Sequence, residues 1–140
     1  MIKNCYVGVK GIVKVGDSVL VLKKGSGDGA YWDIPGGRID DNETLEETLK
    51  RELSEELPTL GVYTIGGVVS AYRLSKNIDD DKALVLIFYK VEAEPFDVTL
   101  SHEHSAFTWM TKETLPELLT SGTPIEKGYY NAFTRALELG

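Results

Sequence analysis

The sequence predicts an α/β fold in which helices cover a mixed β-sheet. Segments rich in Val, Ile and Leu alternate with turns that contain Gly and Pro, which is typical of strands. Two other segments place apolar residues at helical spacing, and several of the expected strands separate them. The 140 residues are about the length of one domain, 42% of them are hydrophobic, and no internal repeat or linker interrupts them. We therefore expect residues 1–140 to form a single domain.

The N-terminal part of the chain predicts a hairpin and then a short strand. Residues 7–15 and 18–23 are rich in Val, Ile and Leu, and a Gly-Asp pair separates them, as in a hairpin. Residues 24–30 contain three glycines and predict a loop. Residues 31–34 predict a short strand, which the Pro-Gly-Gly sequence at residues 35–37 ends.

The clearest helix begins after Thr44. Thr44 and Glu47 form a capping-box pattern, in which each side chain accepts a hydrogen bond from a backbone N–H at the start of the helix. Leucines then recur at every fourth position and share one face of the helix: Leu45, Leu49, Leu53 and Leu57. Pro58 ends the helix, because proline disfavours helical geometry in the preceding residue and has no N–H.

The second half of the chain predicts three more strands and two more helices. The strands are expected over residues 62–74, 83–91 and 107–110, and the first of them has an irregularity at Gly66-Gly67. A polar turn is expected at residues 75–81 and a loop at residues 100–105, ahead of the last strand. A short helix is expected over residues 111–120. The strand over residues 83–91 is apolar on both faces, which favours a central, covered position. The final helix is expected to bury Ile125, Tyr129, Ala132, Phe133 and Ala136.

The negative charge of the chain is concentrated in one segment. The chain has 15 Lys and Arg against 22 Asp and Glu, a net charge of −7, and residues 40–56 alone hold eight acidic and two basic residues. An acidic protein repels nucleic-acid polymers and anionic membranes, so we expect neither as a partner. The single cysteine excludes an intramolecular disulfide, and the apolar run at residues 83–89 is too short to span a bilayer. With no recognisable targeting segment, we expect a cytoplasmic protein.

Three glutamates in the acidic helix predict a metal site. Glu52, Glu55 and Glu56 stand at positions i, i+3 and i+4, which brings their carboxylates to one side of a helix. Like charges at this spacing repel one another, and a hard divalent cation such as Mg²⁺ offsets that repulsion because it prefers oxygen ligands. The alternative is an acidic helix face that only contacts water.

Fixed spacings ahead of this trio favour the metal site. They join one glycine, one arginine and several glutamates, in the order Gly37, Glu43, Arg51-Glu52, Leu53 and Glu55-Glu56. The pattern resembles the Nudix box, whose family form is G-x5-E-x7-R-E-U-x-E-E-x-G-U with U an apolar residue. The Trp-Asp-Ile-Pro-Gly-Gly sequence at residues 32–37 is similar to the approach usual in that family.

The sequence departs from the family pattern at two positions. Pro58 stands where the family has a glycine that closes the helix in a left-handed conformation, and we expect Gly61-Val62 to supply the missing pair after an insertion. Asn42 stands where many members have glycine, and asparagine tolerates left-handed backbone better than other residues do.

The resemblance implies a Nudix-type α/β/α sandwich with a mixed sheet and a hydrolase that cleaves a diphosphate linked to another group, commonly a nucleoside. It implies Mg²⁺ or Mn²⁺ as cofactor, with the carboxylates of Glu52, Glu55 and Glu56 and the carbonyl of Gly37 as metal ligands. One of these carboxylates, with Glu52 and Glu55 as the candidates, also serves as the general base. The resemblance further implies an ion pair between Arg51 and Glu43 that orients the helix.

Further candidates flank the box. Family members use an additional acid from a later loop, and we expect Glu103 in that role; the alternative is an exposed loop residue. Arg38 is expected to contact a phosphate of a small nucleoside-diphosphate-type substrate, together with the backbone of Gly36 and Gly37. We expect the two histidines that flank Glu103 to contact solvent. A Nudix-fold sensor that binds a nucleotide without turnover is the alternative to an enzyme, and the intact glutamate trio favours the enzyme.

Overall fold

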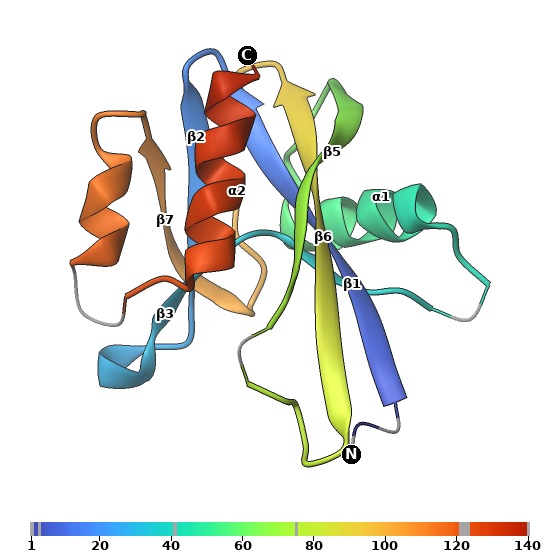
Figure 1. Ribbon diagram of the computed structural model, residues 1–140. Coiled ribbons are helices and arrows are strands. Elements are labelled where there is room, and N and C mark those ends of the chain that lie inside the picture. The colour runs from blue at the N-terminus through green and yellow to red at the C-terminus, as the bar shows by residue number, and fades with distance from the viewer. Residues whose placement is uncertain (1, 3, 41, 75, 121–123, 140) are drawn as a thin grey trace.

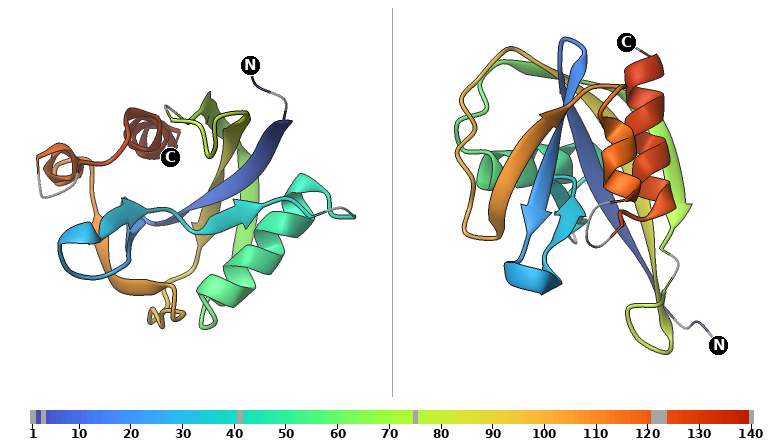
Figure 2. Two further views of the ribbon diagram at one scale, coloured as in Figure 1. Left: turned by 90° about the horizontal axis from the view of Figure 1, so that it is seen from below. Right: turned by 90° about the vertical axis from the view of Figure 1, so that its left-hand side faces the viewer.

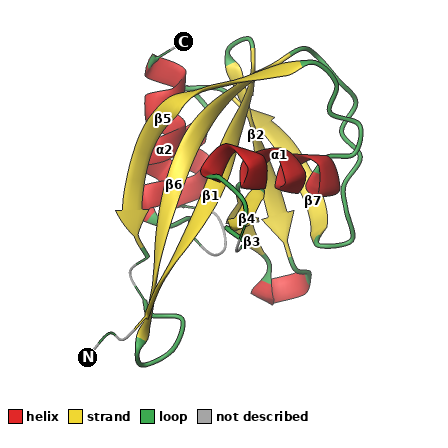
Figure 3. Cartoon of the chain, turned by 90° about the vertical axis from the view of Figure 1, so that its right-hand side faces the viewer, coloured by secondary structure: helices red, strands yellow, loops and turns green. Residues whose placement is uncertain are grey.

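The computed structural model describes residues 2, 4–40, 42–74, 76–120 and 124–139, and it contains one seven-stranded sheet with a helix on each face (Figures 1 and 3). The strands are β1 (Asn4–Val15), β2 (Ser18–Lys24), β3 (Tyr31–Asp33), β4 (Gly36–Arg38), β5 (Tyr63–Arg73), β6 (Lys82–Ala93) and β7 (His104–Met110). The helices are α1 (Leu45–Glu56) and α2 (Lys127–Glu138), with 3-10 helices η1 (Gly27–Gly29) and η2 (Leu115–Leu119). This is the α/β/α arrangement that the sequence predicts.

Strand β1 joins the parts of the sheet. It pairs in parallel with β6 and antiparallel with β2 and β4, so the sheet is mixed. The main order is β3-β2-β1-β6-β5, and β7 pairs with β2. The prediction of a central covered strand is confirmed for β6, which lies between β1 and β5. The predicted irregularity in β5 is also confirmed, because its register with β6 shifts between Ile65 and Val68.

The two helices cover opposite faces of the sheet, as the view along it shows (Figure 2). On the α1 face, three almost fully buried leucines pack against the sheet: Leu49 and Leu53 of the helix and Leu57 at its C-cap. On the α2 face, Ala132, Phe133 and Ala136 pack against Ile12 of β1 and Phe88 of β6. Val13 and Ile12 are adjacent in β1 and enter different cores, which is the alternation of a strand covered on both faces.

Helix α1 begins as predicted and ends just before Pro58, also as predicted, but Gly61 does not close it. The Glu47 N–H donates to the Thr44 hydroxyl at 3.2 Å and the Thr44 N–H donates to the Glu47 carboxylate at 2.9 Å, so the capping box is formed. At the other end, the N–H of Leu57 donates to the Leu53 carbonyl. Among the described residues the glycines with a positive φ are Gly16, Gly25, Gly27 and Gly36. Gly61 therefore does not close the helix in a left-handed conformation, contrary to the prediction.

Three other predicted elements are corrected. Residues 36–38 form strand β4 rather than only a turn, because they pair with residues 8–10 of β1. The helix expected over residues 111–120 is the short 3-10 helix η2. Ile125 is buried but precedes α2, which begins at Lys127.

No helix in the described part of the chain is both long enough and apolar enough to cross a membrane.

Candidate active site

Strand β4 and the last turns of α1 build the candidate site. Gly36, the first residue of β4, has a φ of +152°, and a Cβ there would lie 2.0 Å from the carbonyl oxygen of Val9. Only glycine fits this position, because β4 passes directly against the backbone of β1. The close approach brings the glycine backbone beside the glutamates of α1.

Glu56 is anchored to this turn. One of its carboxylate oxygens accepts a hydrogen bond of 2.6 Å from the backbone N–H of Gly36. The residue is 4% exposed, although its sequence neighbour Glu55 is largely exposed. Removal of the carboxylate from water raises the pKa of Glu56 to about 7, despite the opposing hydrogen bond from Gly36 and the nearby charge of Lys10.

Glu52 lies against the second glycine of the turn. A Cβ on Gly37 would be 2.4 Å from the Oε1 atom of Glu52, so this carboxylate occupies the space that a side chain would need. Partial burial raises the pKa of Glu52, and the negative charges of Glu55 and Glu103 raise it further, against the opposing effect of Arg51. The charge of Glu103 thus acts on Glu52 across the site.

Arg51 connects the two parts of the motif. Its Nε and Nη2 atoms donate to the two carboxylate oxygens of Glu43 at 2.8 and 3.0 Å, which is the predicted ion pair. Its Nη1 atom donates to Glu52 at 3.0 Å and lies 3.5 Å from Glu55. The hydrogen bonds with Arg51 hold the pKa of Glu43 below its usual range and raise the pKa of Arg51. Arg51 thus sets the side-chain directions of Glu43 and Glu52.

The three glutamates among the predicted metal ligands do not form a preassembled cage. Within the described residues, no group of three or more His, Cys, Asp or Glu side chains is close enough together to hold a metal ion. Glu52 and Glu55 face Arg51, whereas Glu56 faces Gly36. The donor set nevertheless fits a hard divalent cation, because it consists of carboxylate and carbonyl oxygens. Burial raises the pKa values of Glu52 and Glu56, and a cation bound beside them would favour their ionised forms.

A buried polar group lies behind the turn. His104 contacts Asp33 at 3.1 Å through Nε2, and Lys10 contacts the other oxygen of Asp33 at 3.1 Å. Burial alone would raise the pKa of Asp33, but Lys10 and His104 outweigh it and hold that pKa at about 2. The prediction that His104 contacts solvent is wrong, since its side chain is 0% exposed. His102 and Glu103 are exposed, as expected for residues of that loop.

The predicted phosphate contact, Arg38, is exposed at the end of β4 and lies over the ring of Tyr6, 5.0 Å from its centroid. Lys23 of β2 lies over the ring of Trp32 of β3, 4.9 Å from its centroid. A cavity of about 590 Å³ adjoins this second pair and is lined by Tyr31, Trp32, Lys76, Pro124, Ile125, Glu126 and Tyr129. Trp32 is partly buried against the core that α2 covers, whereas Tyr31 is 45% exposed.

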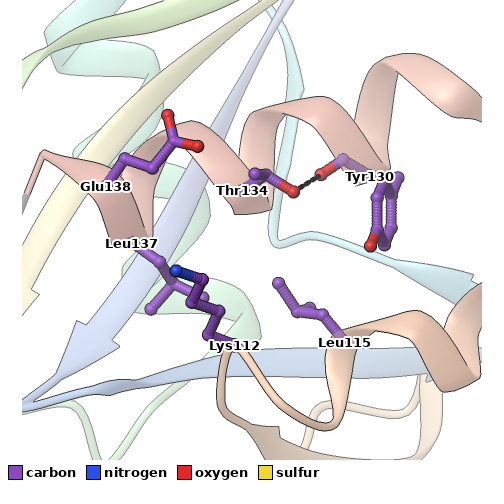
Figure 4. A pocket seen from close by; sticks show the side chains of 6 residues that line it. All are labelled: Lys112, Leu115, Tyr130, Thr134, Leu137 and Glu138. Atoms are coloured by element: carbon purple, nitrogen blue, oxygen red, sulfur yellow. Dashed lines mark hydrogen bonds between the residues drawn. The ribbon is translucent and has the colours of Figure 1, made fainter.

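A smaller cavity of about 240 Å³ lies between η2 and α2 (Figure 4). It is lined by Lys112, Leu115, Tyr130, Thr134, Leu137 and Glu138. The cavity lies on the α2 face of the sheet, and none of the described residues that line it belongs to the pattern from Gly37 to Glu56. This cavity is therefore not part of the candidate site.

Several known proteins are similar to this chain in sequence or in fold. The family model for the NUDIX domain matches residues 7–133. An 8-oxo-dGTP diphosphatase of Proteus vulgaris is 55% identical over 29 residues, which cover 21% of this chain and 26% of that protein. The nucleoside triphosphatase NudI of Enterobacter sp. (strain 638) is 23% identical over 116 residues, 76% of this chain and 82% of that protein.

Two solved structures share the fold. The crystal structure of the MutT protein from Methanosarcina mazei Go1 gives a TM-score of 0.75 at 21% identity and covers 99% of this chain and 97% of that one. The solution structure of the E. coli ORF135 protein gives a TM-score of 0.70 at 22% identity, with 97% and 91% covered. Because the family model spans nearly the whole sequence and the folds agree, the chain belongs to the NUDIX domain family and is a Nudix hydrolase.

Proposed function

We propose that this Nudix hydrolase cleaves a diphosphate linkage in a nucleoside triphosphate or another nucleoside-diphosphate derivative, and that it requires Mg²⁺ or Mn²⁺. The observation that carries the proposal is the glycine turn with a glutamate on each side. The carboxylate of Glu56 accepts a hydrogen bond of 2.6 Å from the N–H of Gly36. The carboxylate of Glu52 occupies the space that a Cβ on Gly37 would need. The turn thereby gathers hard oxygen atoms around backbone that a phosphate can approach.

The glutamates of α1 are proposed to hold the cation. Glu52, Glu55 and Glu56, with the carbonyl of Gly37, would supply oxygen ligands to it. Glu55 is exposed and Glu52 is held through a flexible side chain, so both can turn from Arg51 towards an ion. When bound, the cation would neutralise phosphate charge and lower the pKa of a water molecule.

The cleavage itself needs a group that accepts a proton. A water oxygen forms a bond to phosphorus, the bridging P–O bond breaks, and the electron pair leaves with the departing phosphate oxygen. A proton of the attacking water passes to a carboxylate, for which Glu52, Glu55 and Glu103 are the candidates. The raised pKa of Glu52 makes its carboxylate a stronger base than that of an exposed glutamate, which suits a proton acceptor.

Charge and shape around the turn support a small anionic substrate. The chain carries a net charge of −7, so an approaching diphosphate needs local positive charge. Arg38, beside the exposed end of β4, is proposed to supply part of it. The cavity at Tyr31 and Trp32 is proposed to receive the group attached to the diphosphate, since aromatic rings stack on nucleobases. The names of the two curated relatives, both nucleotide phosphatases, favour a nucleoside as that group.

A panel of nucleoside triphosphates and nucleoside-diphosphate derivatives tests the proposal. Each compound is incubated with the protein and Mg²⁺, Mn²⁺ or EDTA, and released phosphate or pyrophosphate is measured. We expect turnover of at least one compound with a divalent ion, none with EDTA, and a loss of about 10²–10⁴-fold in the Glu52→Gln variant. The matched control is Glu46→Gln, an exposed glutamate of the same helix outside the motif, which should keep full turnover.

Binding without turnover would contradict the proposal. If isothermal titration calorimetry detected a nucleotide that the protein binds but never cleaves, the chain would be a sensor instead of an enzyme.

We also propose that residues 1–140 act as one domain in the cytoplasm, which would agree with the single cysteine.

A further inference from the structure

A buried cluster from four different elements lies directly behind the glycine turn. It consists of Lys10 of β1, Asp33 of β3, Glu56 of α1 and His104 of β7. The side chains are 13%, 6%, 5% and 0% exposed, respectively. Buried charged groups are costly unless they are paired, and none of the steps proposed above uses Asp33, His104 or Lys10. The position of this cluster therefore calls for a role.

The contacts of the imidazole assign its hydrogen. Nε2 of His104 lies 3.1 Å from Asp33 Oδ2, whereas the buried Nδ1 has no hydrogen-bond partner among the described residues. A hydrogen on Nε2 satisfies Asp33, while a hydrogen on Nδ1 would be a buried donor without an acceptor. His104 therefore donates from Nε2 to a carboxylate that Lys10 holds from the other side at 3.1 Å.

The same Nε2 atom faces Glu56. It lies 3.9 Å from Oε1 of Glu56, and Oε2 of that carboxylate accepts the 2.6 Å hydrogen bond from Gly36. The Glu56 carboxylate is thus enclosed between the glycine turn and the imidazole. Because Asp33 and Lys10 fix the imidazole, Glu56 has little freedom to turn away from Gly36.

We propose that His104 is a positioning residue for the proposed hydrolysis, with Asp33 as its anchor. The imidazole keeps the Glu56 carboxylate against the Gly36 N–H, in the orientation in which it can serve as a metal ligand. This inference rests on the proposed function for its catalytic consequence, but the contact between Glu56 and Gly36 can be measured without turnover. Groups that orient metal ligands typically change metal affinity or activity by about 10–100-fold when they are replaced.

Two amide variants separate positioning from simple packing. In His104→Gln the side-chain amide nitrogen occupies about the place of Nε2, so the donor to Asp33 is kept. In His104→Asn the amide nitrogen stands nearer the place of Nδ1, so that donor is lost. Both replacements are neutral amides, and a difference between them therefore reports the position of the donor. His102→Asn is the matched control, since His102 is exposed and lies two residues away.

The experiment uses three readouts on the full chain. The backbone amide resonance of Gly36 in the metal-free protein reports its bond to Glu56. The dissociation constant for Mn²⁺ is measured from the electron paramagnetic resonance of the free ion, and kcat and KM are measured on a nucleotide that the wild type cleaves. We expect His104→Asn to shift the Gly36 resonance upfield, weaken Mn²⁺ binding about 10–100-fold and lower kcat more than it changes KM. His104→Gln should restore all three.

The other outcomes contradict either the positioning role of His104 or the proposed hydrolysis. If His104→Asn matches His102→Asn, or if His104→Gln restores nothing, His104 only fills space and the positioning role is overturned. If the wild type cleaves no nucleotide, the proposed function fails, while the Gly36 resonance and Mn²⁺ affinity still decide the positioning role.

Should His104→Asn fail to fold, Asp33→Leu replaces it. This variant removes the oxygen that accepts from Nε2 of His104 and the partner of Lys10, so the same changes in the Gly36 resonance and Mn²⁺ affinity are expected. Unchanged values in a folded Asp33→Leu protein would overturn the anchor role.

Discussion

The carboxylate of Glu56 accepts a hydrogen bond of 2.6 Å from the backbone N–H of Gly36, and this bond joins the last turn of α1 to the start of β4. This hydrogen bond is buried, and the low dielectric constant of the protein interior makes it stronger than it would be in water. It makes the end of the helix and the glycine turn one rigid unit. The position of every proposed ligand in the site depends on that unit.

Gly37→Ala is predicted to lower activity without unfolding the protein. The added Cβ would meet the Glu52 carboxylate at 2.4 Å, and that flexible group can move aside. Since a misplacement of about 1 Å can cost about 10²-fold in rate, we expect kcat to fall by about that factor. Thermal unfolding should be nearly unchanged. Gly61→Ala is the control, because a Cβ on Gly61 meets nothing within 4 Å; equal kcat values for the two variants would contradict the account.

Removal of single charges identifies the proton acceptor. Glu55→Gln and Glu103→Gln each keep the shape of the side chain and remove its charge. If the residue accepts the proton, kcat should fall by about 10²–10⁴-fold, and the dependence of the rate on pH should change. Both residues are exposed, so the fold should remain intact. A full rate in Glu103→Gln would show that this residue is a bystander and leave Glu52 and Glu55 as the candidates.

Leu49→Ala is predicted to destabilise the protein strongly. Leu49 is fully buried on the face of α1 that packs on β1, so its truncation leaves a cavity. The expected loss in the free energy of unfolding is about 2–5 kcal/mol, measured by urea titration. Leu119→Ala, at a leucine that is 42% exposed, should cost much less. A similar loss in both variants would mean that the packing of α1 contributes little.

Asp33 is predicted to make the protein sensitive to acid. Its pKa is lowered from 3.8 to about 2 in the folded protein, so its contribution is complete above pH 3.8 and is lost as the pH falls towards 2. That contribution is about 2 kcal/mol. We therefore expect the difference in unfolding free energy between wild type and Asp33→Asn to shrink between pH 4 and 2. A difference that stays constant over this range would contradict the assigned ion pairs.

Local features of the sequence predict α1 and its carboxylates well. The capping box of Thr44 and Glu47 and the fourfold spacing of the leucines act within one helix, so neighbours along the chain suffice to define them. The bidentate pair of Arg51 and Glu43, which are eight residues apart, was expected from the resemblance to the Nudix box rather than from helical spacing. Local spacing does not predict the different environments of Glu55 and Glu56, because the exposure of each depends on where β4 lies.

The buried histidine could not be predicted from neighbouring residues. His104 and Asp33 are 71 residues apart, and they meet only because β3 and β7 both pair with β2. One signal was present in the sequence: His104 and Met110 are six residues apart, so they share a face in an extended strand, and Met110 is apolar. Strand β4 was missed for a related reason, since its pairing with β1 depends on a glycine backbone that carries no side-chain pattern.

A crystal soaked in MnCl₂ tests the central claim most directly. The account predicts an anomalous manganese peak between the carboxylates of Glu52 and Glu56 and the carbonyl oxygen of Gly37, with the Glu55 side chain turned towards it. The same soak of Glu52→Gln crystals should weaken or remove the peak. A wild-type map with no manganese at the turn, or with manganese only at distant carboxylates such as Asp79 and Asp81, would contradict the account.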